Sequence, residues 1–282
     1  MEIDELEELS MEALSQIKNG DILLSYIGLL CQDKEKTDSE NVMEKKKVLI
    51  TGASRGIGKA IAIEFAKKGY DIYVTCKNSF PELQRLCNEL EANYNIKATA
   101  FLADAGNAES ADKLFADIQD IDVVVNNAGI SYIGLLTDMS VKEWNSVIDT
   151  NFNSLFYVCR HAVPLMVSKK SGKIINISSV WGNVGASMEV AYSAAKGGMN
   201  AFTKALAKEL APSNIQVNAI ACGVIDTQMN QYFSEEEKEA LREEIPADRF
   251  GKPEEVAGLV LQLAEGNTYL TGQIIALDGG WN

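Results

Sequence analysis

The chain has 282 residues, of which 46% are hydrophobic and 23% charged, and this suits a globular protein with one large α/β domain or two small ones. Its formal net charge of −14 argues against nucleic acid or an anionic membrane as a partner. Five cysteines without a C-x-x-C pair argue against a zinc site and for reduced thiols, and a single histidine argues against histidine-based metal chemistry and a Ser-His-Asp triad.

Residues 1–43 differ from the rest in composition. They hold eleven acidic and three basic residues, and apolar residues from Ile3 to Ile17 recur at helical spacing. A second apolar stretch, Asp21–Cys31, precedes a polar linker. We expect a short helical N-terminal extension that docks on the main body, a second subunit or a partner. The equal alternative is a poorly ordered tail, or an upstream extension with the functional start at Met43.

The beginning of the chain also bears on location. Met1–Glu5 is acidic where a signal peptide would need a basic region, and the apolar part of the extension is too short to span a bilayer. We therefore expect a cytoplasmic protein.

A strand, a glycine-rich turn and a helix follow one another from Val48 to Lys68. Val48–Ile50 is an apolar run, Thr51–Gly58 has the spacing G-x-x-x-G-x-G, and Lys59–Lys68 is amphipathic. Glycines in such a turn let the backbone approach a pyrophosphate, whose charge then faces the N-terminus of the helix. This arrangement predicts a dinucleotide site.

The second predicted strand, Asp71–Thr75, bears on the choice of dinucleotide. A site selective for NAD often has an acidic residue near the end of this strand, which binds the adenosine ribose 2′-hydroxyl. Here the strand runs into Cys76-Lys77-Asn78, and the cations Arg55 and Lys77 can bind a 2′-phosphate instead. We therefore favour NADPH (NADP) as the cofactor, with NADH as the alternative.

Strands and helices continue to alternate to the end of the chain. We expect strands at 97–102, 121–125, 173–177, 215–220 and 273–277, and helices at 81–93, 108–118, 140–158 and from Tyr192 to Leu210. Asp104, after the third strand, is placed to accept a hydrogen bond from an adenine amino group. The alternation predicts a Rossmann-type α/β domain at 44–282, with a doubly wound parallel seven-stranded sheet and helices on both faces.

Tyr192 and Lys196 are four residues apart, so they lie one turn apart on one face of a helix. A lysine close to a phenol stabilises the phenolate and lowers the tyrosine pKa from about 10 towards a range useful for proton transfer. Ser178 and Ser179 follow a predicted strand, and either hydroxyl could polarise a carbonyl beside the phenol. Taken alone, the Tyr-x-x-x-Lys spacing is also a common accident on helices.

Together these features resemble the short-chain dehydrogenase/reductase family over residues 44–282. The matching motifs, in chain order, are Thr51-Gly52-x-x-x-Gly56-x-Gly58, Asp104, Asn126-Asn127-Ala128-Gly129, Asn151, Ser179, Tyr192-x-x-x-Lys196 and Asp278-Gly279-Gly280. The resemblance implies hydride transfer between a nicotinamide and a carbonyl or alcohol. It also implies a homotetramer packed partly through the long helices that start at Ser140 and Tyr192, although apolar residues there, such as Met199, Phe202 and Leu206, equally suit the core.

The resemblance assigns roles to particular residues. Tyr192 donates a proton to the carbonyl oxygen, Lys196 lowers its pKa and holds the nicotinamide ribose, and Ser179 rather than Ser178 orients the carbonyl. Asn151 interrupts its helix and holds a water that links Lys196 to solvent. The expected cofactor contacts are Gly52, Ser54, Arg55 and Ile57 with the phosphates, Asp104 and Ala105 with adenine, Asn127 alongside the cofactor, and Ile225 and Thr227 with the carboxamide.

One departure from the family pattern follows the sixth strand. The family usually has Pro-Gly there, whereas this chain has Ala221-Cys222-Gly223. The change removes a constraint on φ beside the nicotinamide and brings a thiol close to it.

Within the family, the motifs are most similar to those of 3-oxoacyl-(acyl carrier protein) reductases. The similar stretches are Thr51–Gly58, Asn126–Ile130 and Arg249–Ala257. We therefore expect a 3-oxoacyl thioester substrate, free or on a carrier protein; the alternatives are the 5-aminopentanone group on elongation factor P and another small carbonyl or alcohol.

Substrate choice is expected in a mobile lid at Thr227–Arg249. This segment is acidic, which suits a cationic substrate slightly better. An acidic carrier protein would instead need a basic patch, for which the candidates are Arg160, Lys169, Lys170 and Lys173, with solvated surface as the plainer interpretation.

Two hypotheses of a different class accompany the enzyme. A non-catalytic dinucleotide-binding scaffold would not need Asn151, Ser179, Tyr192 and Lys196 together, so this set argues against it. An interaction protein acting through its N-terminal helices would be separated from the enzyme by deleting residues 1–42 and measuring activity and assembly.

Overall fold

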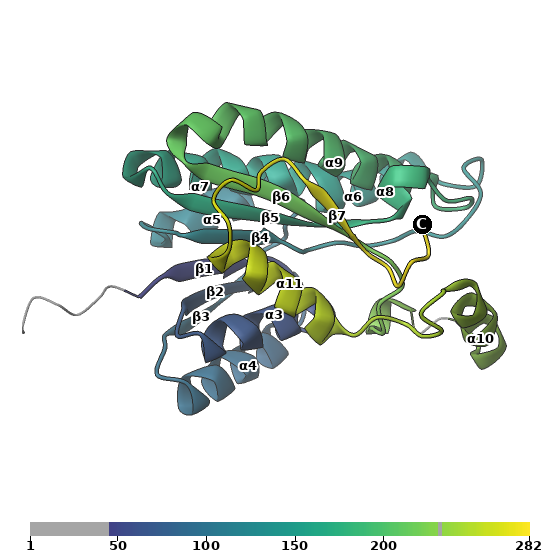
Figure 1. Cartoon of the computed structure of the whole chain (residues 1–282), viewed down its shortest axis with the longest axis horizontal. Coiled ribbons are helices and arrows are strands. Elements are labelled where there is room, and N and C mark those ends of the chain that lie inside the picture. Colours follow the sequence, from purple (N-terminus) through teal and green to yellow (C-terminus); the bar gives the residue numbers. More distant parts are fainter. Residues whose placement is uncertain (1–44, 231–232) are drawn as a thin grey trace, which may run out of the picture. The chain divides into compact units, whose positions relative to one another are not determined.

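Seven parallel strands form one sheet in the computed structural model, which describes residues 45–230 and 233–282 (Figure 1). The strands are β1 (Lys47–Ile50), β2 (Asp71–Cys76), β3 (Ala98–Leu102), β4 (Val123–Asn126), β5 (Gly172–Ser179), β6 (Ile215–Cys222) and β7 (Ile274–Leu277). Their spatial order is β3-β2-β1-β4-β5-β6-β7. The predicted doubly wound, seven-stranded parallel sheet is therefore confirmed, whereas the predicted extension at 1–43 lies outside the described residues.

Helices cover both faces of the sheet (Figure 1). The main ones are α3 (Gly56–Lys67), α4 (Phe80–Asn93), α5 (Ala108–Asp117), α6 (Val141–Ile148), α7 (Ser154–Lys169), α9 (Val190–Leu210), α10 (Glu235–Glu244) and α11 (Pro253–Glu265). One hydrophobic core lies between the sheet and α3, α4 and α11, and a second lies under α5, α7 and α9. Strand β1 serves both, because Val48 and Ile50 face the first core and Leu49 the second.

Strands β1 and β4 are neighbours in the sheet although β2 and β3 separate them in the chain. The connections that leave β1 and β4 run in opposite directions across the sheet. Open α/β sheets bind ligands in the crevice that this reversal creates at the carboxyl ends of the two strands. The fold therefore brings the ends of β1, β4, β5 and β6 together at one place.

Several boundaries differ from those predicted. The helix predicted at 140–158 is α6, a π-helical turn η1 (Asp149–Asn153) and α7, which continues to Lys169. Ser178 and Ser179 belong to strand β5, and Cys222 belongs to β6, because both strands are longer than their most apolar cores. The prediction did not identify α8 (Trp181–Val184), α10 and α11 as helices; α8 is a single turn and α10 is mainly charged, so neither has a long apolar stripe.

Residues 45–282 form one compact unit. Within the described part of the chain, no helix is long and apolar enough to cross a bilayer, and no three His, Cys, Asp or Glu side chains gather as metal ligands would.

Candidate active site

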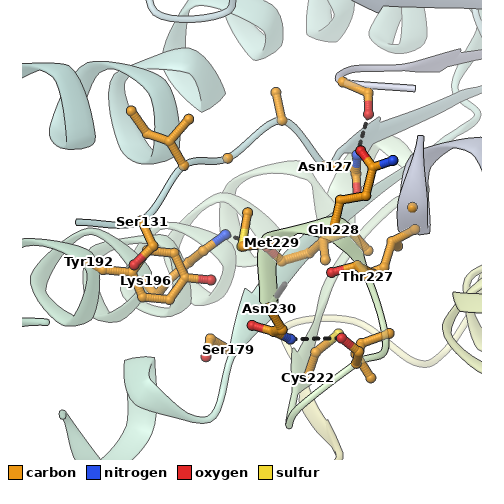
Figure 2. Close-up of a pocket in the computed structure, with 18 of the residues that line it drawn as sticks. Asn127, Ser131, Ser179, Tyr192, Lys196, Cys222, Thr227, Gln228, Met229 and Asn230 are labelled. Atoms are coloured by element: carbon orange, nitrogen blue, oxygen red, sulfur yellow. Dashed lines mark hydrogen bonds between the residues drawn. The ribbon is translucent and has the colours of Figure 1, made fainter. Parts of the chain in front are cut away.

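A cavity of about 1350 Å³ runs along the carboxyl ends of the strands, from the glycine-rich turn after β1 to Tyr192 on α9. Figure 2 shows the Tyr192 and Lys196 side chains beside each other on their helix, with Ser179 and Cys222 coming from strand ends. Almost every site residue predicted from the sequence lines this cavity; the exception is Asn151, which lies behind its wall. These residues lining the cavity are Gly52, Ser54, Arg55, Ile57, Lys77, Asp104, Ala105, Asn127, Ser179, Tyr192, Lys196, Ile225 and Thr227.

The glycine turn can pack closely against its neighbours in the protein only because side chains are missing from it. Gly52 has a φ of +68°, and a Cβ there would lie 2.8 Å from the Cα of Ala128. A Cβ on Gly58 would lie 2.5 Å from the carbonyl oxygen of Gly52 and 2.6 Å from the side-chain nitrogen of Asn127. The backbone is therefore packed as tightly as glycine allows.

Helix α3 begins inside this turn, at Gly56, earlier than the predicted Lys59. No side chain caps its N-terminus, and its first turn contains no acidic residue. The free amide groups and the positive end of the helix dipole therefore suit an anion. This donor set fits the pyrophosphate of a dinucleotide, which Gly52, Ser54, Arg55 and Ile57 would hold.

Asn127 holds the turn in place. Its side-chain nitrogen donates to the carbonyl oxygens of Thr51 at 2.9 Å and Gly52 at 3.0 Å, and its backbone nitrogen donates to the Thr51 hydroxyl at 3.0 Å. Both side-chain amide hydrogens are thereby used within the protein. Asn127 supports the floor on which a cofactor would lie.

The far end of the cavity carries the predicted adenosine contacts. Lys77 and Asp104 form an ion pair with an Nζ–Oδ2 distance of 2.8 Å, which joins the ends of β2 and β3. The Arg55 guanidinium has no hydrogen bond or ion pair with any other residue that the structure describes, and it is exposed at the cavity. Arg55 and two of the three Nζ hydrogens of Lys77 therefore remain as donors for a phosphate.

Ser179, Tyr192 and Lys196 meet at the other end. Lys196 is 97% buried, since only 3% of its surface is exposed, and its Nζ donates to the carbonyl oxygen of Ile177 at 2.7 Å. The same Nζ lies 5.4 Å from the centre of the Tyr192 ring. The Ser179 hydroxyl accepts from the backbone nitrogen of Trp181 at 3.2 Å, which fixes the position of its oxygen.

The structure alters the predicted electrostatics of Tyr192. Burial raises the pKa of its phenol, and nearby Cys222 and Glu189 raise it further, while the hydrogen bond with Ser179 lowers it. The expected net lowering of the Tyr192 pKa was wrong for this arrangement, because the effect of burial is the largest and raises it. Burial also lowers the pKa of Lys196, to about 8. At neutral pH the phenol keeps its proton, which is the state of a proton donor.

Asn151 lies in the π-helical turn η1 and is fully buried. Its side chain exchanges hydrogen bonds with Ile130, donating at 2.8 Å to the oxygen and accepting at 3.2 Å from the nitrogen. A Cβ on Gly129 would lie 2.7 Å from the Asn151 Oδ1 and 3.8 Å from the Lys196 Nζ. The interrupted helix thus brings Asn151 close to the lysine behind the cavity wall.

The segment after β6 closes the middle of the cavity. Ile225 pairs with Gly251 in an isolated bridge, and its carbonyl oxygen accepts from the Asn230 side chain at 2.8 Å (Figure 2). The Thr227 methyl group would lie 3.4 Å from a Cβ on Gly56, so this segment touches the glycine turn. Cys222 is buried and lines the same wall, and burial raises the pKa of its thiol to about 12.

The substrate end contains residues that were not predicted from the sequence. Ser131 donates to Glu189 at 2.6 Å, and Trp181 packs against Trp281 with ring centres 4.9 Å apart. All four line the cavity together with Glu237 and Glu244 of the acidic lid. The position of Trp181, two residues after Ser179, was the one available signal; the others come from loops whose paths the sequence does not specify.

Most of the candidate residues for a basic docking patch contact other groups of the protein. Lys169 binds Asp120 and Asp122, both at 2.7 Å, so its charge is neutralised. Lys173 is partly buried, which lowers its pKa, and the guanidinium of Arg160 lies over the Phe156 ring. Lys169, Lys173 and Arg160 are thus separately engaged, which favours solvated surface over a single docking patch.

Comparison with known proteins agrees with this geometry. The family model for short chain dehydrogenases matches residues 46–238. An uncharacterized oxidoreductase of Bacillus subtilis, YmfI, is 41% identical over 84% of this chain and 99% of its own length. The 3-oxoacyl-[acyl-carrier-protein] reductase FabG of Aquifex aeolicus is 41% identical, over 84% of this chain and 98% of its own length. FabG of Staphylococcus aureus is 40% identical, over 83% of this chain and 97% of its own length.

A solved structure has the same fold. The crystal structure of a putative gluconate dehydrogenase from Agrobacterium tumefaciens aligns with a TM-score of 0.79 and 34% identity, over 84% of this chain and 95% of that one.

Proposed function

The chain belongs to the short-chain dehydrogenase family, and from this premise we propose that it reduces a ketone to an alcohol with NADPH, the ketone being a 3-oxoacyl thioester. Oxidoreductase activity between C=O and CH–OH follows from the family. The observation that carries the proposal is the convergence of Ser179, Tyr192 and Lys196 at one end of a cavity whose other end is the glycine turn.

The chain's own residues supply binding, orientation and one proton. When bound, a nicotinamide supplies the hydride. The Ser179 hydroxyl, held by the Trp181 backbone nitrogen, donates a hydrogen bond to the substrate carbonyl oxygen. Tyr192, whose pKa burial raises, keeps its proton until that oxygen gains negative charge and then transfers it. Protonated Lys196, fixed on the Ile177 carbonyl, stabilises the phenolate that results.

The preference for NADPH rests on charge at the adenosine end. No acidic residue follows β2 directly, and the carboxylate of Asp104, after the neighbouring strand β3, is paired with Lys77. Arg55 is free among the described residues. A 2′-phosphate would therefore meet two cations, whereas a 2′-hydroxyl would lack the usual carboxylate acceptor.

The choice of a 3-oxoacyl thioester is supported by the relatives named 3-oxoacyl-[acyl-carrier-protein] reductase at about 40% identity. A second candidate is an amine-bearing ketone on a protein, such as the 5-aminopentanone group on elongation factor P. The acidic residues Glu189, Glu237 and Glu244 line the substrate end, and the only lining cations among the described residues are Arg55, Lys77 and Lys196, which serve the cofactor and the catalytic centre. This charge favours a cationic substrate.

The test is NADPH oxidation with an acetoacetyl thioester and, separately, with elongation factor P that carries the ketone, using Tyr192→Phe as the control. Turnover of the thioester that the variant loses supports the first candidate. Turnover of the protein-borne ketone alone supports the second. Turnover of neither, at saturating NADPH, would refute both substrate assignments. We further propose that the protein is a homotetramer, which mass measurement in solution would test, and that it is cytoplasmic, which cell fractionation would test.

A further inference from the structure

Two tryptophans far apart in the chain form an aromatic pair at the substrate end of the cavity. Trp181 and Trp281 pack edge to face, with an angle of 61° between their rings and 4.9 Å between the ring centres. Both line the cavity. The backbone nitrogen of Trp181 donates to the hydroxyl of Ser179, so the pair is tied to the residue that meets the carbonyl.

The tail that carries Trp281 is held in one conformation. The Asp278 carboxylate accepts from the backbone nitrogens of Gly280 and Asn282, both at 3.0 Å. A Cβ on Gly223 would lie 2.8 Å from the Cα of Asp278, so the tail presses against the end of β6. These contacts fix residues 278–282 although they follow the last strand.

The same tail touches the end of the lid. The Gly279 oxygen accepts from the backbone nitrogen of Ala247 at 3.0 Å. A Cβ on Gly279 would meet the side chains of both Ile245 and Ala247 at 2.9 Å. Ile245 follows α10 directly and is buried, and α10 supplies Glu237, Leu241 and Glu244 to the cavity wall.

The tail therefore connects the lid helix with the segment after Ser179. Figure 1 shows the C-terminal end between α8 and α10, in agreement with these contacts. Neither α10 nor α8 has a large core of its own to hold it, since α10 has no buried residue and α8 is one turn long. The tail touches α8 at Trp181 and the residues Ile245 and Ala247 that follow α10.

We propose that Trp281 is a positioning and specificity residue. Through the 278–282 tail it holds α10 and Trp181 in place. Together with Trp181 it forms a wall of the cavity, and the apolar part of the substrate next to the reacting carbonyl packs on this wall. This inference rests on the proposed function for the position of that carbonyl. It does not depend on whether the ketone is free or bound to a protein.

The test compares Trp281→Ala and Trp281→Phe with Trp144→Phe, a matched control because Trp144 lies on α6 and does not line the cavity. The measurements are kcat and KM with acetoacetyl and 3-oxooctanoyl thioesters, the Kd of NADPH, and amide hydrogen exchange in 235–247. We expect Trp281→Ala to raise the KM of the thioesters at least tenfold, and to raise it more for the longer one. We expect kcat to change less than threefold and the Kd of NADPH to change less than twofold. Exchange in 235–247 becomes at least tenfold faster.

Trp281→Phe should lie between Trp281→Ala and the wild type, since it keeps an aromatic contact. An unchanged KM with unchanged exchange would overturn the inference, and so would an equal rise of KM and of the Kd for NADPH, which would indicate a general loss of structure. If the wild type turns over neither thioester, the proposed substrate fails, and the exchange measurement alone decides the role of the tail: faster exchange supports it and unchanged exchange refutes it.

Discussion

The Nζ of Lys196 donates a hydrogen bond to the carbonyl oxygen of Ile177 at 2.7 Å, which joins helix α9 to strand β5 two residues before Ser179. This bond holds the lysine close to the Tyr192 ring without a direct bond to the phenol. One interaction therefore sets the relative position of the groups on the helix and on the strand.

The first prediction concerns the charge of this lysine. Burial lowers the pKa of Lys196 from 10.5 to about 8, so the ammonium ion is present below pH 8 and is lost as the pH rises above it. Because the cation stabilises the phenolate that forms at Tyr192, we expect kcat for ketone reduction to fall above about pH 8. Lys196→Arg keeps a cation that does not titrate in this range and should flatten the profile. A rate that rises between pH 8 and 9.5 would contradict this role.

The second prediction concerns Tyr192. Replacing it by phenylalanine removes the proton donor but leaves the glycine turn intact, so kcat should fall by about 10²- to 10⁴-fold while the Kd of NADPH stays within threefold. Single-turnover kinetics and fluorescence titration measure the two quantities. Retention of more than a tenth of the wild-type rate would exclude Tyr192 as the main proton donor.

The third prediction tests the cofactor preference. Arg55→Ala and Lys77→Ala each remove a cation from the adenosine end, so we expect KM for NADPH to rise about 5- to 50-fold, as loss of a charge-assisted contact implies, with little change for NADH. Lys59→Ala, an exposed cation on α3 that does not line the cavity, is the matched control. Equal effects on both cofactors would show that these cations do not read the 2′ position.

The fourth prediction uses the close packing of the glycine turn. A Cβ at residue 58 would overlap the Gly52 oxygen and the Asn127 side chain, so Gly58→Ala should shift the turn, cost about 1–3 kcal/mol of stability and weaken NADPH binding at least tenfold. Gly258→Ala, in the interior of α11 with open space around it, should instead be neutral or stabilise by up to about 1 kcal/mol. Thermal unfolding and NADPH titration of both variants provide the comparison.

The fifth prediction concerns Cys222. Burial raises the pKa of this thiol to about 12, so almost no thiolate is present at pH 8. We expect iodoacetamide to leave Cys222 unmodified in the folded protein and to modify it after denaturation, as mass spectrometry of the peptide would show. Rapid labelling of the native protein would mean that the cavity wall opens at this position.

The sequence by itself determined the sheet, the glycine turn and the shared helix face of Tyr192 and Lys196. Buried strands such as β4 contain continuous apolar runs, here residues 123–125, and the i, i+4 spacing of Tyr192 and Lys196 specifies a shared helix face. Both patterns are local. The interruption of the helix at Asn151 was harder to predict, because a π-helical turn leaves no clear mark on the spacing of apolar residues. It was expected only from the family resemblance.

Only the tertiary structure decided the electrostatics and the substrate end. Whether Tyr192 has a raised or lowered pKa depends on how completely its surroundings exclude water, and burial is a property of packing rather than of spacing. The contact of Trp181 with Trp281 joins positions one hundred residues apart, and Lys169, one candidate for a basic patch, is paired with Asp120 and Asp122. Such contacts depend on loop paths and strand order, which bring together side chains that no local pattern relates.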